Sequence, residues 1–197
     1  MDRRRSSRDV DAVAVGNRET DAWAAYYRHE WRRFLVAAVG MVAAGFRMSR
    51  YHTVLGAWHV LRANQLWAPY PDNDPDGARA SMRRFYTLVA EDRKLPIDPT
   101  RAAELEVKWW RLHRERQRGA VDSDSPLVRA LVDLYAYVYS APPQSMYDAA
   151  RHRVRAMDLS DRWVEAGCRA DDPLLAQERL ALVASHAALL DAVARCP

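Results

Sequence analysis

Cysteine is scarce in this sequence, and its scarcity narrows the classes of protein to consider. The 197 residues contain two cysteines, Cys168 and Cys196. They form no CxxC pair and no metal-binding spacing, so the sequence indicates neither a zinc finger nor a disulfide-rich secreted domain. HExxH, GxSxG and the Glu-x-x-His pattern of ferritin-like dimetal proteins are also missing. We therefore expect reduced thiols, as in a cytoplasmic protein.

Lysine is almost absent, which changes how the positive charge is interpreted. Lys94 and Lys108 stand against 28 arginines, and the net charge is +4 with a pI near 9.3. A strong excess of arginine over lysine is typical of GC-rich codon usage, so composition explains part of the basicity. The arginines are spread through every segment beside Asp and Glu, whereas a nucleic-acid-binding protein gathers its basic residues on one face. We therefore expect no nucleic-acid partner.

Long hydrophobic runs are missing as well. The longest apolar run covers residues 34–46, whereas a helix needs ~20 apolar residues to cross a bilayer. The N-terminal residues are basic but lack the apolar stretch of a signal peptide. We expect no membrane partner, a cytoplasmic location and a solvated, disordered arm over residues 1–20.

Alternation of polar and apolar residues at period two is nearly absent, whereas helical spacing occurs almost throughout. We predict an all-α, single-domain bundle of about seven mostly antiparallel helices over residues 21–197, because short connections join the helices. Four helices begin at an Asp-Pro or Ser-Pro pair, which is a typical helix start. The predicted helices span residues 21–46, 49–67, 74–92, 98–119, 125–140, 143–167 and 172–194.

Small residues gather in the first predicted helix, where Gly40 and Gly45 stand among alanines. Small side chains let another helix approach closely. The sequence leaves open tight packing inside the bundle, the interface of a homodimer and a shallow wall against a flat ligand.

Two adjacent tryptophans mark the most informative predicted helix. Glu106 and His113 are seven residues apart, close to two turns, so both lie along the edge that carries Trp109. We expect a catalytic pair in which His113 is the general base or a ligand and Glu106 orients it. Trp109, Trp110 and Trp58 would form an aromatic floor for the substrate. The alternative is a half-buried structural edge, with Glu106 paired to an arginine and His113 bonded to a carbonyl.

Three further histidines fall on apolar or bordering rows of their helices. His186 lies on the apolar side of the last helix, and His52 and His59 are seven residues apart in an earlier one. Neutral imidazoles in apolar surroundings are common haem or metal ligands, although a single hydrogen-bonded core histidine is the alternative. Asn64 and Gln65, near the end of the same helix as His52, are candidates for the mouth of a substrate pocket.

The sequence thus favours a small all-helical bacterial enzyme that acts on an apolar or aromatic small molecule. A haem- or transition-metal-dependent oxidoreductase of biosynthesis is one form of this hypothesis, with His186, His59 and His52 as the candidate ligands. The alternative is a dimeric, non-enzymatic helical protein that binds a small-molecule ligand or has a regulatory role. No motif in the chain decides between an enzyme and a binding protein.

Overall fold

The computed structural model describes residues 10–119 and 125–196, and within these ranges the regular structure is entirely helical. A single-turn 3₁₀ helix precedes α8. The elements are α2 (Ala12–Tyr27), α3 (Trp31–Phe46), α4 (Arg50–Trp67), α5 (Pro75–Arg93), α6 (Pro99–Gln117), α7 (Ser125–Tyr139), η1 (Pro143–Met146), α8 (Tyr147–Glu165) and α9 (Pro173–Arg195).

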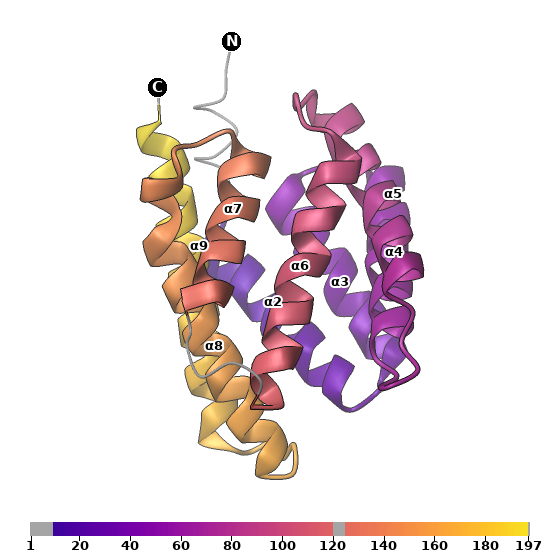
Figure 1. The fold of residues 1–197 in the computed structure, drawn as a ribbon, viewed down its shortest axis with the longest axis vertical. Helices are drawn as coiled ribbons and strands as arrows, with labels where there is room; N and C mark the ends of the chain where they lie inside the picture. Colours follow the sequence, from indigo (N-terminus) through magenta and orange to yellow (C-terminus); the bar gives the residue numbers. More distant parts are fainter. Residues whose placement is uncertain (1–9, 120–124, 197) are drawn as a thin grey trace.

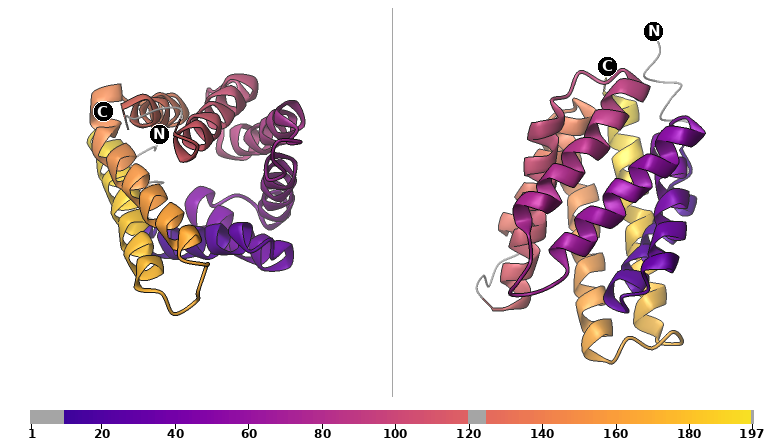
Figure 2. Two further views of the ribbon diagram at one scale, coloured as in Figure 1. Left: turned by 60° about the horizontal axis from the view of Figure 1, so that its bottom comes forward. Right: turned by 90° about the vertical axis from the view of Figure 1, so that its right-hand side faces the viewer.

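Each α-helix packs against its neighbour in the sequence, and α2 also packs against α9. Elements from opposite ends of the described chain therefore lie side by side and close the bundle (Figure 1). Figure 2 shows the helices arranged around a common centre. The predicted all-α, single-domain bundle is confirmed, with eight α-helices in the described part of the chain instead of about seven.

The additional helix arises because the predicted helix 21–46 is divided into α2 and α3. The chain turns between them at His29, whose φ of 56° is left-handed and incompatible with a continuous helix. Asp11 caps α2 by accepting hydrogen bonds from two backbone N–H groups of its first turn. The helix therefore begins at Ala12 and not at residue 21, so the expected disordered arm is wrong for residues 12–20. Residues 1–9 of that arm lie outside the described ranges.

The predicted starts of three other helices are confirmed in detail. The side chains of Asp74, Asp98 and Asp172 each accept a hydrogen bond from a backbone N–H in the first turn of their helix. A proline follows each cap. At this first position of a helix the backbone N–H has no partner within the helix, so proline, which lacks an N–H, costs no hydrogen bond. Such a cap stabilises a helix by ~1 kcal/mol. These local signals explain why the boundaries of α5, α6 and α9 were predictable.

The glycines pack helices together inside this chain. A Cβ atom on Gly40 would meet the side chain of Arg18 in α2 at 2.9 Å, and one on Gly45 would meet Val15 of α2 at 3.9 Å. The closest approach is at Gly16, where a Cβ would lie 2.7 Å from the backbone nitrogen of Val183 in α9. The glycine face of α3 is thus turned toward α2, which supports its interpretation as tight packing inside the bundle.

The core contains charged groups as well as apolar ones. Trp163, Leu131 and Met157 are fully buried, and so are the carboxyl groups of Glu19 and Glu178. Burying a carboxyl group is costly unless it is paired or protonated, so both acids call for an explanation. None of the described helices is both long enough and apolar enough to span a bilayer.

Candidate functional site

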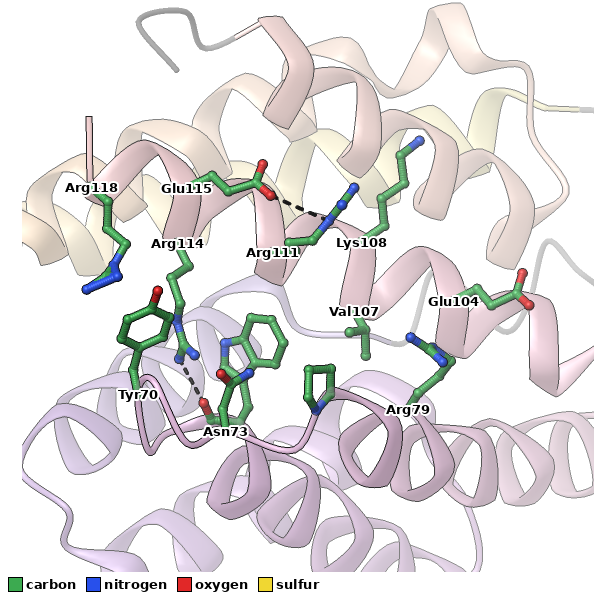
Figure 3. Close-up of a pocket in the computed structure, with 12 residues that line it drawn as sticks. Tyr70, Asn73, Arg79, Glu104, Val107, Lys108, Arg111, Arg114, Glu115 and Arg118 are labelled. Atoms are coloured by element: carbon green, nitrogen blue, oxygen red, sulfur yellow. Dashed lines mark hydrogen bonds and ion pairs between the residues drawn. The ribbon is translucent and has the colours of Figure 1, made fainter. Parts of the chain in front are cut away.

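A groove opens between α6 on one side and the α4–α5 turn with the first turns of α5 on the other (Figure 3). Its volume is about 610 Å³, within the range of ~300–1,000 Å³ typical of small-molecule sites. We call it the α5–α6 groove. Its lining residues are Trp67, Tyr70, Asn73, Pro75, Arg79, Glu104, Val107, Lys108, Arg111, Arg114, Glu115 and Arg118.

Positive charge dominates this groove, because five of its lining residues are basic and two are acidic. Three of the basic residues form ion pairs, namely Arg79–Asp76, Lys108–Asp133 and Arg111–Glu115. Of the two acids, Glu115 takes part in one of these pairs and Glu104 binds Arg101. Arg114 and Arg118 have no carboxylate partner within the described residues. Arg118 is exposed and its charge is available to an anion, whereas Nη1 of Arg114 is buried, so Arg114 acts on the groove through its charge.

Aromatic rings hold these two guanidinium groups in place. Arg118 lies over the ring of Tyr70, 3.5 Å from its centre, and Arg114 lies 4.4 Å from the centre of the Trp67 ring. The Nη2 of Arg114 also donates a hydrogen bond of 2.8 Å to the carbonyl oxygen of Trp67. A guanidinium stacked on a ring keeps its in-plane N–H groups free for a carboxylate or phosphate. Arg118 thus supplies hydrogen-bond donors and Arg114 supplies uncompensated charge.

The described lining of the groove is dominated by basic and apolar side chains. None of the described residues that line it is a histidine, cysteine, serine or threonine. Lys108, the one amine in the lining, is engaged with Asp133 at 3.1 Å. The remaining lining residues are aromatic or aliphatic apart from Asn73, Glu104 and Glu115, with Val107 between the basic side chains in the view of Figure 3. The described lining thus combines positive charge with apolar side chains.

Glu106 is hydrogen-bonded inside the bundle and does not bind His113. Its carboxylate accepts a hydrogen bond from the Tyr86 hydroxyl at 2.7 Å and from the indole N–H groups of Trp109 and Trp110, both at 3.1 Å. Burial raises the pKa of Glu106, and these hydrogen bonds counter that effect only in part. The predicted role of Glu106 in orienting His113 is therefore wrong. Trp109 and Trp110 are each only 8% exposed, and neither lines the α5–α6 groove.

His113 is paired with a carboxylate from α8. Its Nε2 lies 3.1 Å from Oδ2 of Asp161, and Gln117 donates a hydrogen bond of 2.6 Å to the other oxygen of that carboxylate. Arg116 lies 3.8 Å from Asp161. A carboxylate partner fixes the orientation of an imidazole. The sequence identified His113 correctly as a paired histidine but assigned it the wrong partner.

His186 belongs to a buried ion-pair network that joins α2, α8 and α9. Its Nε2 lies 2.6 Å from Oε2 of Glu19, and Arg153 forms an ion pair with the same carboxylate. Burial acts to raise the pKa of Glu19, but the nearby Arg153 and His186 outweigh it and lower the pKa to about 2. The guanidinium of Arg153 also lies over the rings of Trp23 and Trp109. The network explains how Glu19 remains charged inside the core.

The two histidines of α4 lie elsewhere in the fold. His52 Nδ1 is 2.7 Å from Asp92 Oδ1, which ties α4 to α5. Partial burial lowers the pKa of His59, and the charge of Arg84 acts in the same direction. No group of three or more His, Cys, Asp or Glu side chains in the described ranges could hold a metal ion. The candidate ligands His186, His59 and His52 therefore do not come together in one such group.

The other predicted binding residues of α4 do not form a pocket together. Trp58 is 47% exposed on the outer surface. Asn64 donates a hydrogen bond to the Val60 carbonyl of its own helix, and Gln65 accepts one from Arg62. None of the three lines the α5–α6 groove, which uses Trp67 from the end of α4 instead.

Two residues of the buried network were missed although the sequence carries a signal for them. Glu19 falls in a helical row with the buried residues Val15 and Ala22, and Arg153 is one turn from the buried Met157. A charged residue in an apolar helical row predicts a buried ion pair. The signal was hidden because residues 1–20 were assigned to a disordered arm.

Comparison of the chain with protein-family models, with curated proteins and with solved structures finds no match. The chemistry of the α5–α6 groove is therefore the basis on which a function can be inferred.

Proposed function

We propose that this protein binds a small aromatic acid in the α5–α6 groove. The observation that carries the proposal is the pair Arg114 and Arg118, which are stacked on Trp67 and Tyr70 and lack a carboxylate partner among the described residues. An isolated positive pair one helical turn apart is unfavourable by a few tenths of a kcal/mol. A bound anion removes this repulsion and adds charge-assisted hydrogen bonds.

The shape of the groove supports a ligand with an apolar body. Trp67, Tyr70 and Val107 provide ring faces and a methyl surface next to the basic side chains. Small-molecule sites typically combine a largely apolar wall with a few polar groups that set the orientation of the ligand. The acid group would lie on Arg118, and the ring would lie along the aromatic wall.

Isothermal titration of the full chain with indole-3-acetate and naphthalene-2-carboxylate tests this proposal. Indole-3-acetamide, which has the same ring as indole-3-acetate but no charge, serves as the control ligand. Arg118→Gln is expected to weaken binding of the acids about tenfold, because one charge-assisted hydrogen bond contributes ~1.5–3 kcal/mol. Arg32→Gln, an exposed arginine of α3 outside the groove, is the matched protein control. Equal affinity for the acid and the amide, or unchanged affinity in Arg118→Gln, would refute the proposal.

An enzymatic function is a second candidate, favoured by the His113–Asp161 pair. In this form the protein acts on an apolar or aromatic small molecule, and His113, oriented by Asp161, is the general base. Each ligand that binds is incubated with the protein and analysed by mass spectrometry. A product that the wild type forms and His113→Gln does not would support an enzyme, whereas ligands recovered unchanged from the wild type would exclude this candidate. The absorbance spectrum and metal content of the purified protein test a haem- or metal-dependent form.

A further inference from the structure

A second groove, separate from the one described above, lies between α7 and α8. Its volume is about 480 Å³. Val154, which is 3% exposed, forms part of its base, and the half-exposed ring of Tyr147 borders it. Three arginines line it, Arg129 from α7 and Arg151 and Arg155 from α8, with Asp158 as the one acid among the described lining residues. We call it the α7–α8 groove.

The acids closest in sequence to two of these arginines are bound to other helices. Asp158, three residues after Arg155, forms an ion pair with Arg116 of α6. Asp133, one turn after Arg129 in α7, forms an ion pair with Lys108 of α6. Arg129 and Arg155 have no hydrogen-bond or ion-pair partner in the described ranges. Among the residues that the structure describes, no carboxylate pairs with either guanidinium group.

The third arginine adds to this excess. Arg151 approaches Asp148 only to 4.0 Å, and both side chains are largely exposed, so that pair contributes little. Arg151 and Arg155 are also one turn apart on the same helix, where like charges repel each other. Three guanidinium groups and one carboxylate leave the groove with a net charge of +2.

We propose that the α7–α8 groove binds a small phosphomonoester. A phosphate monoester carries −1.5 to −2 charges at pH 7 and three acceptor oxygens, which matches the charge of the groove, whereas a carboxylate neutralises only half of it. Planar guanidinium groups bind phosphate through paired hydrogen bonds, and Arg129 and Arg155 approach from two different helices. The groove is larger than a phosphate ion, so the organic part of the ligand packs on Tyr147 and Val154.

Isothermal titration with phenyl phosphate and with inorganic phosphate, in a phosphate-free buffer, tests this proposal on the full chain. Phenyl phosphate is expected to bind more tightly than inorganic phosphate, because only the ester reaches the ring of Tyr147. Arg129→Gln/Arg155→Gln is expected to weaken phenyl phosphate binding about 100-fold, about tenfold for each lost charged contact. Arg129→Lys/Arg155→Lys keeps the charge and loses the planar fork, so its affinity is expected to fall between the two.

Two further variants assign the binding to one groove. Arg114→Gln/Arg118→Gln removes the same charge from the α5–α6 groove, and Arg32→Gln/Arg50→Gln removes it from exposed positions outside both. Arg32→Gln/Arg50→Gln is expected to bind phenyl phosphate within about twofold of the wild type. Arg114→Gln/Arg118→Gln is expected to lose only the phenyl phosphate that the α5–α6 groove binds, and its remaining binding is expected to depend on Arg129 and Arg155. Unchanged binding in Arg129→Gln/Arg155→Gln, equal affinities for the ester and the free ion, or a loss confined to Arg114→Gln/Arg118→Gln would overturn the proposal.

The test is independent of the function proposed for the α5–α6 groove. Binding of indole-3-acetate is expected to be unchanged in Arg129→Gln/Arg155→Gln. A protein that binds phenyl phosphate and no aromatic carboxylate would retain the phosphate site and lose the proposed function. The reverse result would retain the proposed function and remove the phosphate site.

Discussion

Replacing the buried Glu178 by glutamine is expected to stabilise the protein, and increasingly so as the pH rises. The side chain of Glu178 is fully buried in α9, and neither carboxylate oxygen makes a hydrogen bond in the described structure. Burial raises its pKa from 4.5 to about 8, and the nearby Ser160 hydroxyl opposes that rise too weakly to cancel it. The folded protein therefore holds a proton on Glu178 at pH 7, whereas the unfolded chain has released it.

The sign of the pH dependence follows from that difference. Between the unfolded pKa of 4.5 and the folded pKa of about 8, the folded state binds more protons, so raising the pH lowers the free energy of unfolding. One pKa unit corresponds to ~1.4 kcal/mol, so the loss between pH 5 and pH 8 is about 3 kcal/mol. Glu178→Gln has nothing to titrate and removes this loss, while it keeps the size of the side chain.

Urea unfolding of both proteins at a series of pH values measures the effect. The two stabilities are expected to be similar near pH 5 and to diverge by about 3 kcal/mol at pH 8 in favour of the variant. Glu91→Gln, at an exposed position of α5, is the matched control and should follow the wild type throughout. Parallel pH profiles for the wild type and Glu178→Gln would refute the assignment of a neutral carboxyl group to the core.

Two further predictions concern packing and charge. Glu19→Gln leaves the buried charge of Arg153 without its carboxylate partner and is expected to destabilise the protein by about 3–5 kcal/mol in urea unfolding at pH 7. In the wild type, the contribution of Glu19 should be lost as the pH falls from its unfolded pKa of 4.5 to its folded pKa of about 2. Gly16→Ala places a methyl group 2.7 Å from the backbone of Val183, so we expect it to destabilise the protein by about 1–3 kcal/mol in thermal unfolding. Gly45→Ala leaves 3.9 Å to the nearest neighbouring atom, so we expect the stability to be unchanged or to rise by about 0.5–1 kcal/mol.

The helical fold was predictable because its signals are local. An Asp-Pro pair satisfies helix-start chemistry within four residues, so α6 was predicted at 98–119 and found at Pro99–Gln117. The failure at α2 has the opposite cause. Glu19 shares a helical row with Val15 and Ala22, but the arginine that makes its burial possible is 134 positions later.

The candidate site was less predictable, because its parts come from distant segments. Arg114 binds the carbonyl of Trp67, 47 positions earlier, and nothing in the neighbouring sequence indicates that contact. The spacing of Glu106 and His113 correctly placed both near one edge of α6. A helix edge faces more than one neighbour, however, and the two side chains turn to α5 and α8 respectively.

The tryptophan that lines the α5–α6 groove is not isolated. The ring of Trp67 lies 5.8 Å from that of Trp110, which in turn lies 6.0 Å from Trp109. At such separations indoles exchange excitation energy, so a molecule that quenches Trp67 lowers the fluorescence of all three tryptophans. The intrinsic fluorescence of the protein thereby becomes a label-free reporter of what enters the groove.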